Sequence, residues 1–185
     1  MKDCDLLSAA ASAGFDNAAL VGTEDIPFNF AFRKYCEDNL CGQYGANYSC
    51  PPDCGSCEEM RRRIVSHKKA LVLQTLWEIP DFRDAAAIKH AKNTHYHRSA
   101  ALAEVLRHNG IPGFIVGAGG CSLCTPCALK EGLPCRFPEV RYSCMSAYCI
   151  YVKGLCDLCG MNYDYGPGRV AFFGMYVFDG CGAGE

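Results

Sequence analysis

Fifteen of the 185 residues are cysteines, and one group of them has the spacing of a metal site. Cys121, Cys124 and Cys127 follow one another with two residues between neighbours, and Cys135 comes soon after in a proline-flanked turn. A loop with this spacing can direct three sulfurs at one centre, and the turn can supply a fourth. Cubane iron–sulfur clusters are commonly held in this way. The last gap is longer than in ferredoxins, so the match to that pattern is partial.

Glycines directly before this group would let the backbone approach a metal centre closely. Gly119 and Gly120 can turn their amide N–H groups toward sulfur, and Arg136 could offset the negative charge of a four-thiolate cubane. We therefore expect these three residues to contact the cofactor. Four thiolates also satisfy a structural zinc site, although zinc ribbons usually show two separated pairs. The pattern favours [4Fe–4S], with zinc as the alternative and reactive or inert thiols as a third interpretation.

A second cysteine-rich segment runs from Cys36 to Cys57 and is rich in Gly, Pro and Asn, which predicts a loop. Here Cys36, Cys41 and Cys50 could bind a second metal centre, with Cys54 or Cys57 as a fourth ligand. If neither joined, one iron would stay open to an exogenous ligand, which would allow chemistry as well as electron transfer. A surface loop around one structural metal is the alternative.

The remaining cysteines carry weaker signals. Cys156 and Cys159 form a CxxC pair that would lie on one face of a helix. Without a partner pair, half-buried packing is the simpler interpretation. Cys144 and Cys149 follow no spacing pattern, and we interpret them as packing residues.

Three histidines are further candidates for ligation or catalysis. His95 lies on the apolar stripe of a predicted helix, which favours a packed, hydrogen-bonded side chain. His90 and His97 are seven residues apart and could share a face of that helix. The sequence assigns no catalytic residue.

A short basic run, Arg61–Arg63, is the main concentration of positive charge. A solvated helix end is the simpler interpretation. The functional alternative is a docking patch for an acidic redox partner protein such as a flavodoxin or ferredoxin.

Composition limits the class and the compartment. The formal net charge of -2 argues against nucleic-acid binding, which usually needs a concentrated basic face. No apolar stretch is long enough to cross a membrane, and the polar start Met1–Asp5 does not resemble a secretory signal. We therefore expect a single domain over residues 1–185 in the cytoplasm, where thiols stay reduced. Because so many thiols are sensitive to oxidation, we expect the host to be an anaerobe.

The elements that must position these residues alternate between helices and strands. Helical patterns cover residues 3–14, 56–64, 81–108 and 142–160, and strand patterns cover residues 18–21, 70–77, 114–116 and 171–178. Such alternation predicts an α/β or α+β fold, in which a small mixed sheet of about four strands is covered by helices. The two cysteine- and glycine-rich loops, residues 36–57 and 117–138, would hold metal.

With these motifs, the chain resembles a family of predicted metal-binding proteins of bacteria and archaea, domain of unknown function 2284. The resemblance covers about residues 10–178 and rests on the stretches 41–52, 117–128 and 134–138, with Arg33 ahead of the first ligand. It implies that the chain binds a metal group, that this group is an iron–sulfur cluster, and that the host is an anaerobe. The ligands that it implies are Cys36, Cys41, Cys50, Cys121, Cys124, Cys127 and Cys135.

The chain departs from this family at residues 143–152, which read SCMSAYCIYV. The family tends to carry a proline, a glutamate, a glycine and an aspartate there, so no role that needs those acids is expected. Cys144 and Cys149 lie in this stretch and would allow an additional metal or thiol site.

Three functions follow from these observations. The first is an iron–sulfur protein that transfers electrons or serves as an accessory to a redox enzyme. The second is an iron–sulfur enzyme whose three-cysteine centre exposes an iron to a small sulfur-containing or corrinoid-linked substrate. The third is a zinc-stabilised interaction module without a redox role.

Overall fold

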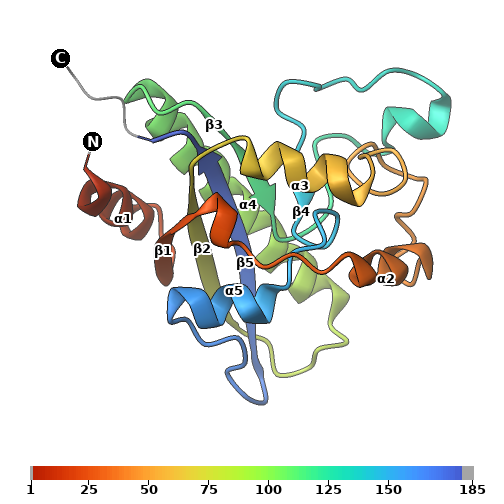
Figure 1. The fold of residues 1–185 in the computed structure, drawn as a ribbon. Coiled ribbons are helices and arrows are strands. Elements are labelled where there is room, and N and C mark those ends of the chain that lie inside the picture. The colour runs from red at the N-terminus through yellow and green to blue at the C-terminus, as the bar shows by residue number, and fades with distance from the viewer. Residues whose placement is uncertain (1, 181–185) are drawn as a thin grey trace.

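The computed structural model describes residues 2–180 and contains a mixed five-stranded sheet between two layers of helices (Figure 1). The strands are β1 Asn17–Gly22, β2 Lys69–Glu78, β3 Gly113–Gly117, β4 Ser143–Cys144 and β5 Arg169–Phe178. Their order across the sheet is β1-β2-β5-β3-β4. Neighbours pair antiparallel except β3 and β4, which are parallel.

The helices of the described chain begin and end at clear local signals. They are α1 Asp3–Ser12, α2 Arg33–Glu37, α3 Cys57–Val65, α4 Ala85–His108 and α5 Val152–Cys159, with short 3-10 turns η1 Thr23–Asp25, η2 Phe30–Phe32 and η3 Ala128–Glu131. Ser56 and Glu59 form a reciprocal capping box at the start of α3. Asp84 caps α4 by accepting from two backbone N–H groups. Within residues 2–180, no helix combines the length and apolarity that crossing a membrane requires.

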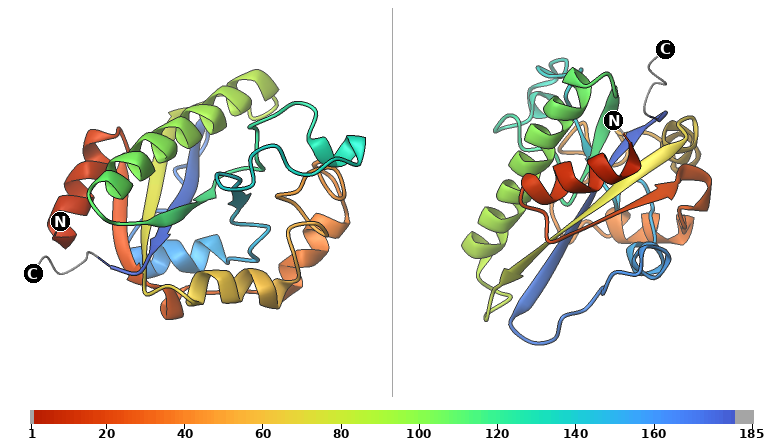
Figure 2. Two further views of the ribbon diagram at one scale, coloured as in Figure 1. Left: turned by 90° about the horizontal axis from the view of Figure 1, so that it is seen from above. Right: turned by 90° about the vertical axis from the view of Figure 1, so that its left-hand side faces the viewer.

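Helices cover both faces of the sheet, as the view from above shows (Figure 2), and an apolar core lies between each layer of helices and the sheet. On β2, Leu71 and Leu73 pack against α1 and α4, whereas Ala70 and Val72 pack against α3 and α5. This alternation follows from the two-residue period of a strand. Each fully buried leucine contributes roughly 1.5–3 kcal/mol relative to an exposed one. The central strands are therefore fixed from both sides and provide a rigid support for the loops.

The α/β class predicted from the sequence is confirmed, with two differences in detail. The sheet has a fifth strand, β4, which is only two residues long and carries no pattern of its own. The helix predicted over residues 142–160 is wrong in its first half. There the chain forms β4 and then a turn in which Cys149 has a φ of 57°, which an α-helix does not accommodate, and α5 begins only at Val152. The helix expected from residue 81 begins at Ala85, behind its Asp84 cap.

Both cysteine-rich segments lie at the same end of the molecule, beyond the β3–β4 side of the sheet (Figures 1 and 2). The segment of residues 36–57 connects α2 to α3, and the segment of residues 117–138 leaves the end of β3. In Figure 1 they appear in orange to gold and in cyan. The fold thus places next to each other two loops that are far apart in the sequence.

Candidate metal centres

The first candidate centre is the quartet Cys121, Cys124, Cys127 and Cys135, in the segment after β3. All four side chains are partly buried. They line one small hollow together with residues of the other cysteine-rich segment, among them Tyr48. The Cys124 and Cys127 sulfurs are within hydrogen-bonding reach of each other, and Cys121 lies within electrostatic range of Cys124 and Cys135. The structure therefore brings the four predicted ligands of this loop to one place.

The quartet is held by side chains from the neighbouring loop. The Ser49 hydroxyl is buried and accepts a hydrogen bond from the Cys121 backbone N–H at 2.9 Å. Asn47 Nδ2 donates to the Cys121 carbonyl oxygen at 3.0 Å, and the Tyr48 hydroxyl donates to the Leu133 carbonyl oxygen at 2.8 Å. Three consecutive residues of one loop thus position the other, so the two loops form a single structural unit.

Burial and backbone hydrogen bonds act in opposite directions on the quartet thiols, and burial prevails at Cys121 despite hydrogen bonds from the backbone at Leu123 and Tyr142. Burial raises the pKa of the Cys121 thiol, and the neighbouring cysteines raise it further. Burial also acts to raise the pKa of Cys127, but hydrogen bonds from the backbone at Leu129 and Tyr48 outweigh it, so this pKa lies below its ordinary value. Amide donors aimed at sulfur are also a feature that stabilises metal-bound thiolates. The donor set of this hollow fits an iron–sulfur cluster or another thiophilic metal.

The three non-cysteine residues predicted at the cofactor have different surroundings. A Cβ added at Gly120 would lie 3.4 Å from the Cys50 sulfur, so a side chain here would crowd the second cysteine group. Gly119 faces the aliphatic part of Lys92 rather than a cysteine. Arg136 is exposed and bonds to Glu131 at 2.6 Å and to the Pro126 carbonyl oxygen at 3.3 Å. Of the three, Gly120 lies beside a sulfur of the second group, and Arg136 lies within electrostatic range of Cys127, whose pKa it helps to lower.

A second gathering, here called the five-cysteine group, contains two cysteines besides the three predicted ligands. Its members are Cys36, Cys41, Cys50, Cys54 and Cys144. Cys36 and Cys50 each lie within electrostatic range of Cys41, Cys54 and Cys144. Cys144 reaches them from β4, because its strand pairs in parallel with β3 next to the quartet loop. Of the two fourth ligands considered from sequence, the structure thus places Cys54 with the three cysteines, and it adds Cys144, which no sequence pattern indicated.

Burial dominates the chemistry of four members of the five-cysteine group, whereas the side chain of Cys41 is exposed. It raises the pKa of Cys50 to about 12 and also raises those of Cys36, Cys54 and Cys144, with the neighbouring sulfurs adding to the effect on Cys50. Clustered thiols of this kind stay protonated unless a cation replaces the protons. A bound metal supplies that positive charge. The residues present therefore fit a thiolate-ligated metal group.

Cys57, the other fourth ligand considered from sequence, does not join this group by any described contact and lies beside Cys149 instead. Their sulfurs are 3.4 Å apart. Arg33 Nε donates to the Cys57 sulfur at 3.4 Å, and its NH1 group donates to the Cys54 sulfur at 3.8 Å. The interpretation of Cys144 and Cys149 as packing residues was therefore incomplete. Only the sheet pairing and the turn before α5 bring them to other cysteines, and no local spacing indicates this.

Within residues 2–180, no three Cys, His, Asp or Glu side chains converge closely enough to surround a single metal ion. Sulfurs bound to one zinc ion lie about 3.8 Å from one another. A cubane spaces its ligands more widely, because each of its four irons binds a different cysteine. The quartet is a hollow lined by sulfurs rather than a compact cage around one point.

The histidines and the CxxC pair lie apart from these groups. His95 is fully buried against the sheet, with Nδ1 at 2.9 Å from the Thr75 hydroxyl, as expected for a packed side chain. His90 and His97 are exposed on α4. Cys156 and Cys159 lie on α5 and contribute to the core beneath it. In the described chain, none of these five lies among the residues that line the quartet hollow, which leaves the cysteine loops as the candidate site.

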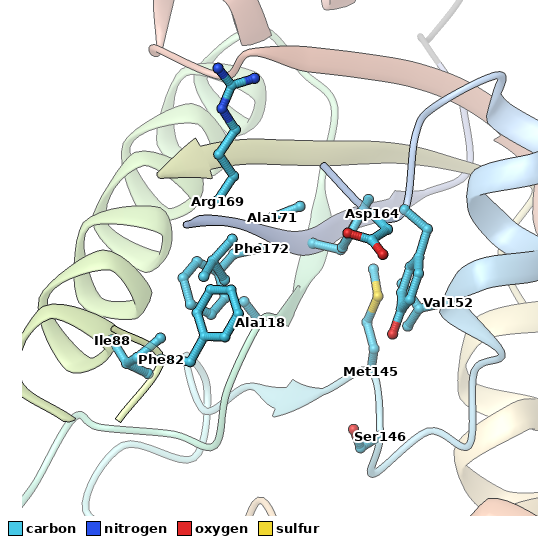
Figure 3. A pocket seen from close by; sticks show the side chains of 13 residues that line it. Phe82, Ile88, Ala118, Met145, Ser146, Val152, Asp164, Arg169, Ala171 and Phe172 are labelled. Carbon is cyan, nitrogen blue, oxygen red and sulfur yellow. The ribbon is translucent and has the colours of Figure 1, made fainter. Parts of the chain in front are cut away.

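A separate pocket of about 470 Å³ opens between α4, β5 and the segment before α5 (Figure 3). Phe82 and Phe172 lie close together in it, and Asp164 and Arg169 supply its charges. Met145 and Ser146, which follow Cys144, form another part of its wall. No cysteine is among the described residues that line this pocket, so it is distinct from both cysteine groups.

Comparison with known proteins gives one match, which covers most of the chain. The family model described as "Predicted metal-binding protein (DUF2284)" matches residues 19–178. This range includes both cysteine-rich loops and confirms the resemblance drawn from their motifs. No curated protein and no solved structure gives a match.

Proposed function

Because the chain belongs to DUF2284, a family of predicted metal-binding proteins, we propose that it binds iron–sulfur clusters of the [4Fe–4S] type and acts in electron transfer or as a redox accessory protein. The observation that carries this proposal is the gathering of nine cysteines into two adjoining groups at one end of the sheet. Their members are Cys121, Cys124, Cys127 and Cys135 in the quartet, and Cys36, Cys41, Cys50, Cys54 and Cys144 in the five-cysteine group.

The contact between the two groups suits a role in electron transfer. Ser49 bonds to the Cys121 backbone and its hydroxyl lies 3.9 Å from the Cys50 sulfur, so one buried side chain connects both groups. Gly120 contributes a second point of contact. When bound, an iron–sulfur cluster supplies a one-electron carrier whose potential depends on hydrogen bonds to sulfur and on burial. Adjoining sulfur-lined sites suit passage of electrons between them.

The protein residues have two roles in this proposal. The cysteines hold the clusters, and the polar residues of the neighbouring loop orient the sulfurs and limit access of water. The quartet is partly exposed, so a redox partner could approach it. The basic residues on α3 offer one means of attracting an acidic partner by electrostatic steering.

The enzyme alternative finds less support than electron transfer. It needs a second centre with only three cysteine ligands, so that one iron stays open. Cys54 and Cys144 both lie in range of Cys36 and Cys50, and either could supply a fourth thiolate. The third alternative, a zinc-stabilised module, is distinguished by the metal that the protein contains.

The proposal is tested by paired serine substitutions in protein purified without oxygen. We expect Cys124→Ser to lower iron content and the broad visible absorption by about half if both groups hold a [4Fe–4S] cluster, because it removes one of four ligands from one of two clusters. Cys159→Ser is the matched control, since Cys159 lies on α5 in the core. It should leave both readouts unchanged. Equal iron content in the two variants would contradict the assignment of the quartet.

A further inference from the structure

One pair of thiols belongs to neither proposed cluster group. Cys57 is the first residue of α3, and Cys149 lies in the turn before α5, 92 positions later in the chain. Their sulfur atoms are 3.4 Å apart. Cys149 is buried and Cys57 is partly exposed, so one sulfur of the pair is open to a reactant and the other lies behind it.

The backbone on both sides of this pair is well anchored. Cys149 donates its N–H to the Ser146 carbonyl oxygen at 3.0 Å, and its carbonyl oxygen accepts from the Asn29 N–H at 2.8 Å. Cys57 follows the capped start of α3. A disulfide needs its sulfurs at about 2.05 Å, so they must approach by roughly 1.4 Å, a distance that small χ rotations supply. The two sulfurs therefore lie close enough for a disulfide to be tested between them.

Arg33 lies directly beside the sulfurs of this pair. Its Nε donates to the Cys57 sulfur at 3.4 Å, and its NH2 group donates to the Ala147 carbonyl oxygen at 3.0 Å. The hydrogen bond to Ala147, two residues before Cys149, thus holds the guanidinium beside the thiols. The positive charge of the guanidinium favours the thiolate that thiol–disulfide exchange requires, and at Cys149 it opposes the burial that raises the pKa of that thiol to about 12.

We propose that Cys57 and Cys149 are a dithiol–disulfide couple that exchanges two electrons with a disulfide oxidant, such as glutathione disulfide or the disulfide of a thioredoxin-like protein. Cys57 loses its proton and attacks one sulfur of the oxidant, so that a mixed disulfide forms and the other sulfur leaves as a thiolate. Cys149 then loses its proton and displaces the second sulfur. The protein gains one disulfide, the oxidant becomes two thiols, and a reducing dithiol reverses the sequence.

The position of the couple gives it a link to the second metal group. Arg33 also donates to the Cys54 sulfur, at 3.8 Å, so oxidation of Cys57 changes the partners of an arginine that touches the five-cysteine group. The exchange itself does not depend on iron. Its chemistry needs only the two sulfurs, the arginine and the external disulfide.

The test is differential alkylation of the full chain, purified without oxygen and equilibrated in glutathione buffers of increasing potential. We expect two fewer alkylated thiols per chain at the oxidising end, a peptide that links Cys57 to Cys149 in mass spectra, and full reversal by dithiothreitol. Cys57→Ser and Cys149→Ser should each abolish that peptide, whereas Cys156→Ser, a matched control on α5, should retain it.

Two outcomes would overturn the proposal. One is the absence of the linked peptide from the wild-type protein over the whole range of potentials, a result that does not depend on any variant folding. The other is a linked peptide that appears only in samples that have lost iron, because the couple would then be a product of cluster breakdown. Iron measured in the same samples separates this second outcome from a failure of the metal assignment.

Discussion

Protonation of His95 should destabilise the fold, because the ring is buried without a partner for a second proton. The ring packs edge-on against Phe15 with centroids 5.4 Å apart, and Nδ1 lies 2.9 Å from the Thr75 hydroxyl. That hydroxyl accepts from Trp77 Nε1 at 3.0 Å, which leaves its own proton free to point to a neutral Nδ1. Nε2 has no hydrogen-bond partner in the described chain. Burial, with a contribution from the charge of Arg98, lowers the pKa of His95 to about 4.

The sign and size of the effect follow from this pKa. Since an unfolded histidine has a pKa near 6.5, the unfolded chain binds the proton first as the pH falls. The stabilisation is complete above pH 6.5 and is lost as the pH falls toward the folded pKa of about 4. The difference between the unfolded and folded pKa values of His95 corresponds to about 3 kcal/mol of unfolding free energy. About 2 kcal/mol of this is lost by pH 5.

Urea unfolding between pH 7.5 and pH 5 measures this loss. Over that range, the free energy of unfolding of the wild-type protein should fall by about 2 kcal/mol more than that of His95→Gln. The variant His97→Gln, which changes an exposed side chain, should behave as the wild type does. Any acid-induced release of metal affects all three proteins and cancels in the comparison. The same pH dependence in wild type and His95→Gln would refute the reasoning.

Two further substitutions test contacts that position the cysteine loops. Ser56→Ala removes the cap of α3 and should lower the free energy of unfolding by about 1 kcal/mol, as measured by urea denaturation. A decrease no larger than that of the exposed control variant Ser66→Ala would contradict the capping role. Ser49→Ala deprives the Cys121 N–H of its acceptor in a buried place. It should cost about 1–3 kcal/mol and speed the loss of iron from anaerobically purified protein, and an unchanged rate of loss would contradict the link between the two loops.

Most of the fold could be predicted because its elements carry strong local patterns. The apolar run within β2 and the Ser56 cap of α3 are visible in the sequence and agree with the structure. β4 was missed because two residues do not establish a period, and it exists only through its pairing with Val116 and Gly117 of β3. The sequence pattern predicts helix at the turn of Cys149, because a positive φ at a non-glycine residue leaves no trace in composition.

In the candidate site too, local spacing predicts some contacts between cysteines and gives no sign of others. Cys121, Cys124 and Cys127 share one short loop, so their spacing alone predicts that they lie together, as they do. Cys144 is placed by the strand order, since its register partner Gly117 leads into the quartet loop. Cys149 is brought to Cys57 by the turn before α5. Contacts of this kind depend on sheet topology, which the sequence pattern did not determine.

Metal and acid-labile sulfide analysis of the wild-type protein, purified and handled without oxygen, tests the central claim most directly. The account predicts a brown protein that contains iron and acid-labile sulfide in equal amounts, since a [4Fe–4S] cluster holds four of each. A colourless protein that carries zinc and no sulfide would contradict it.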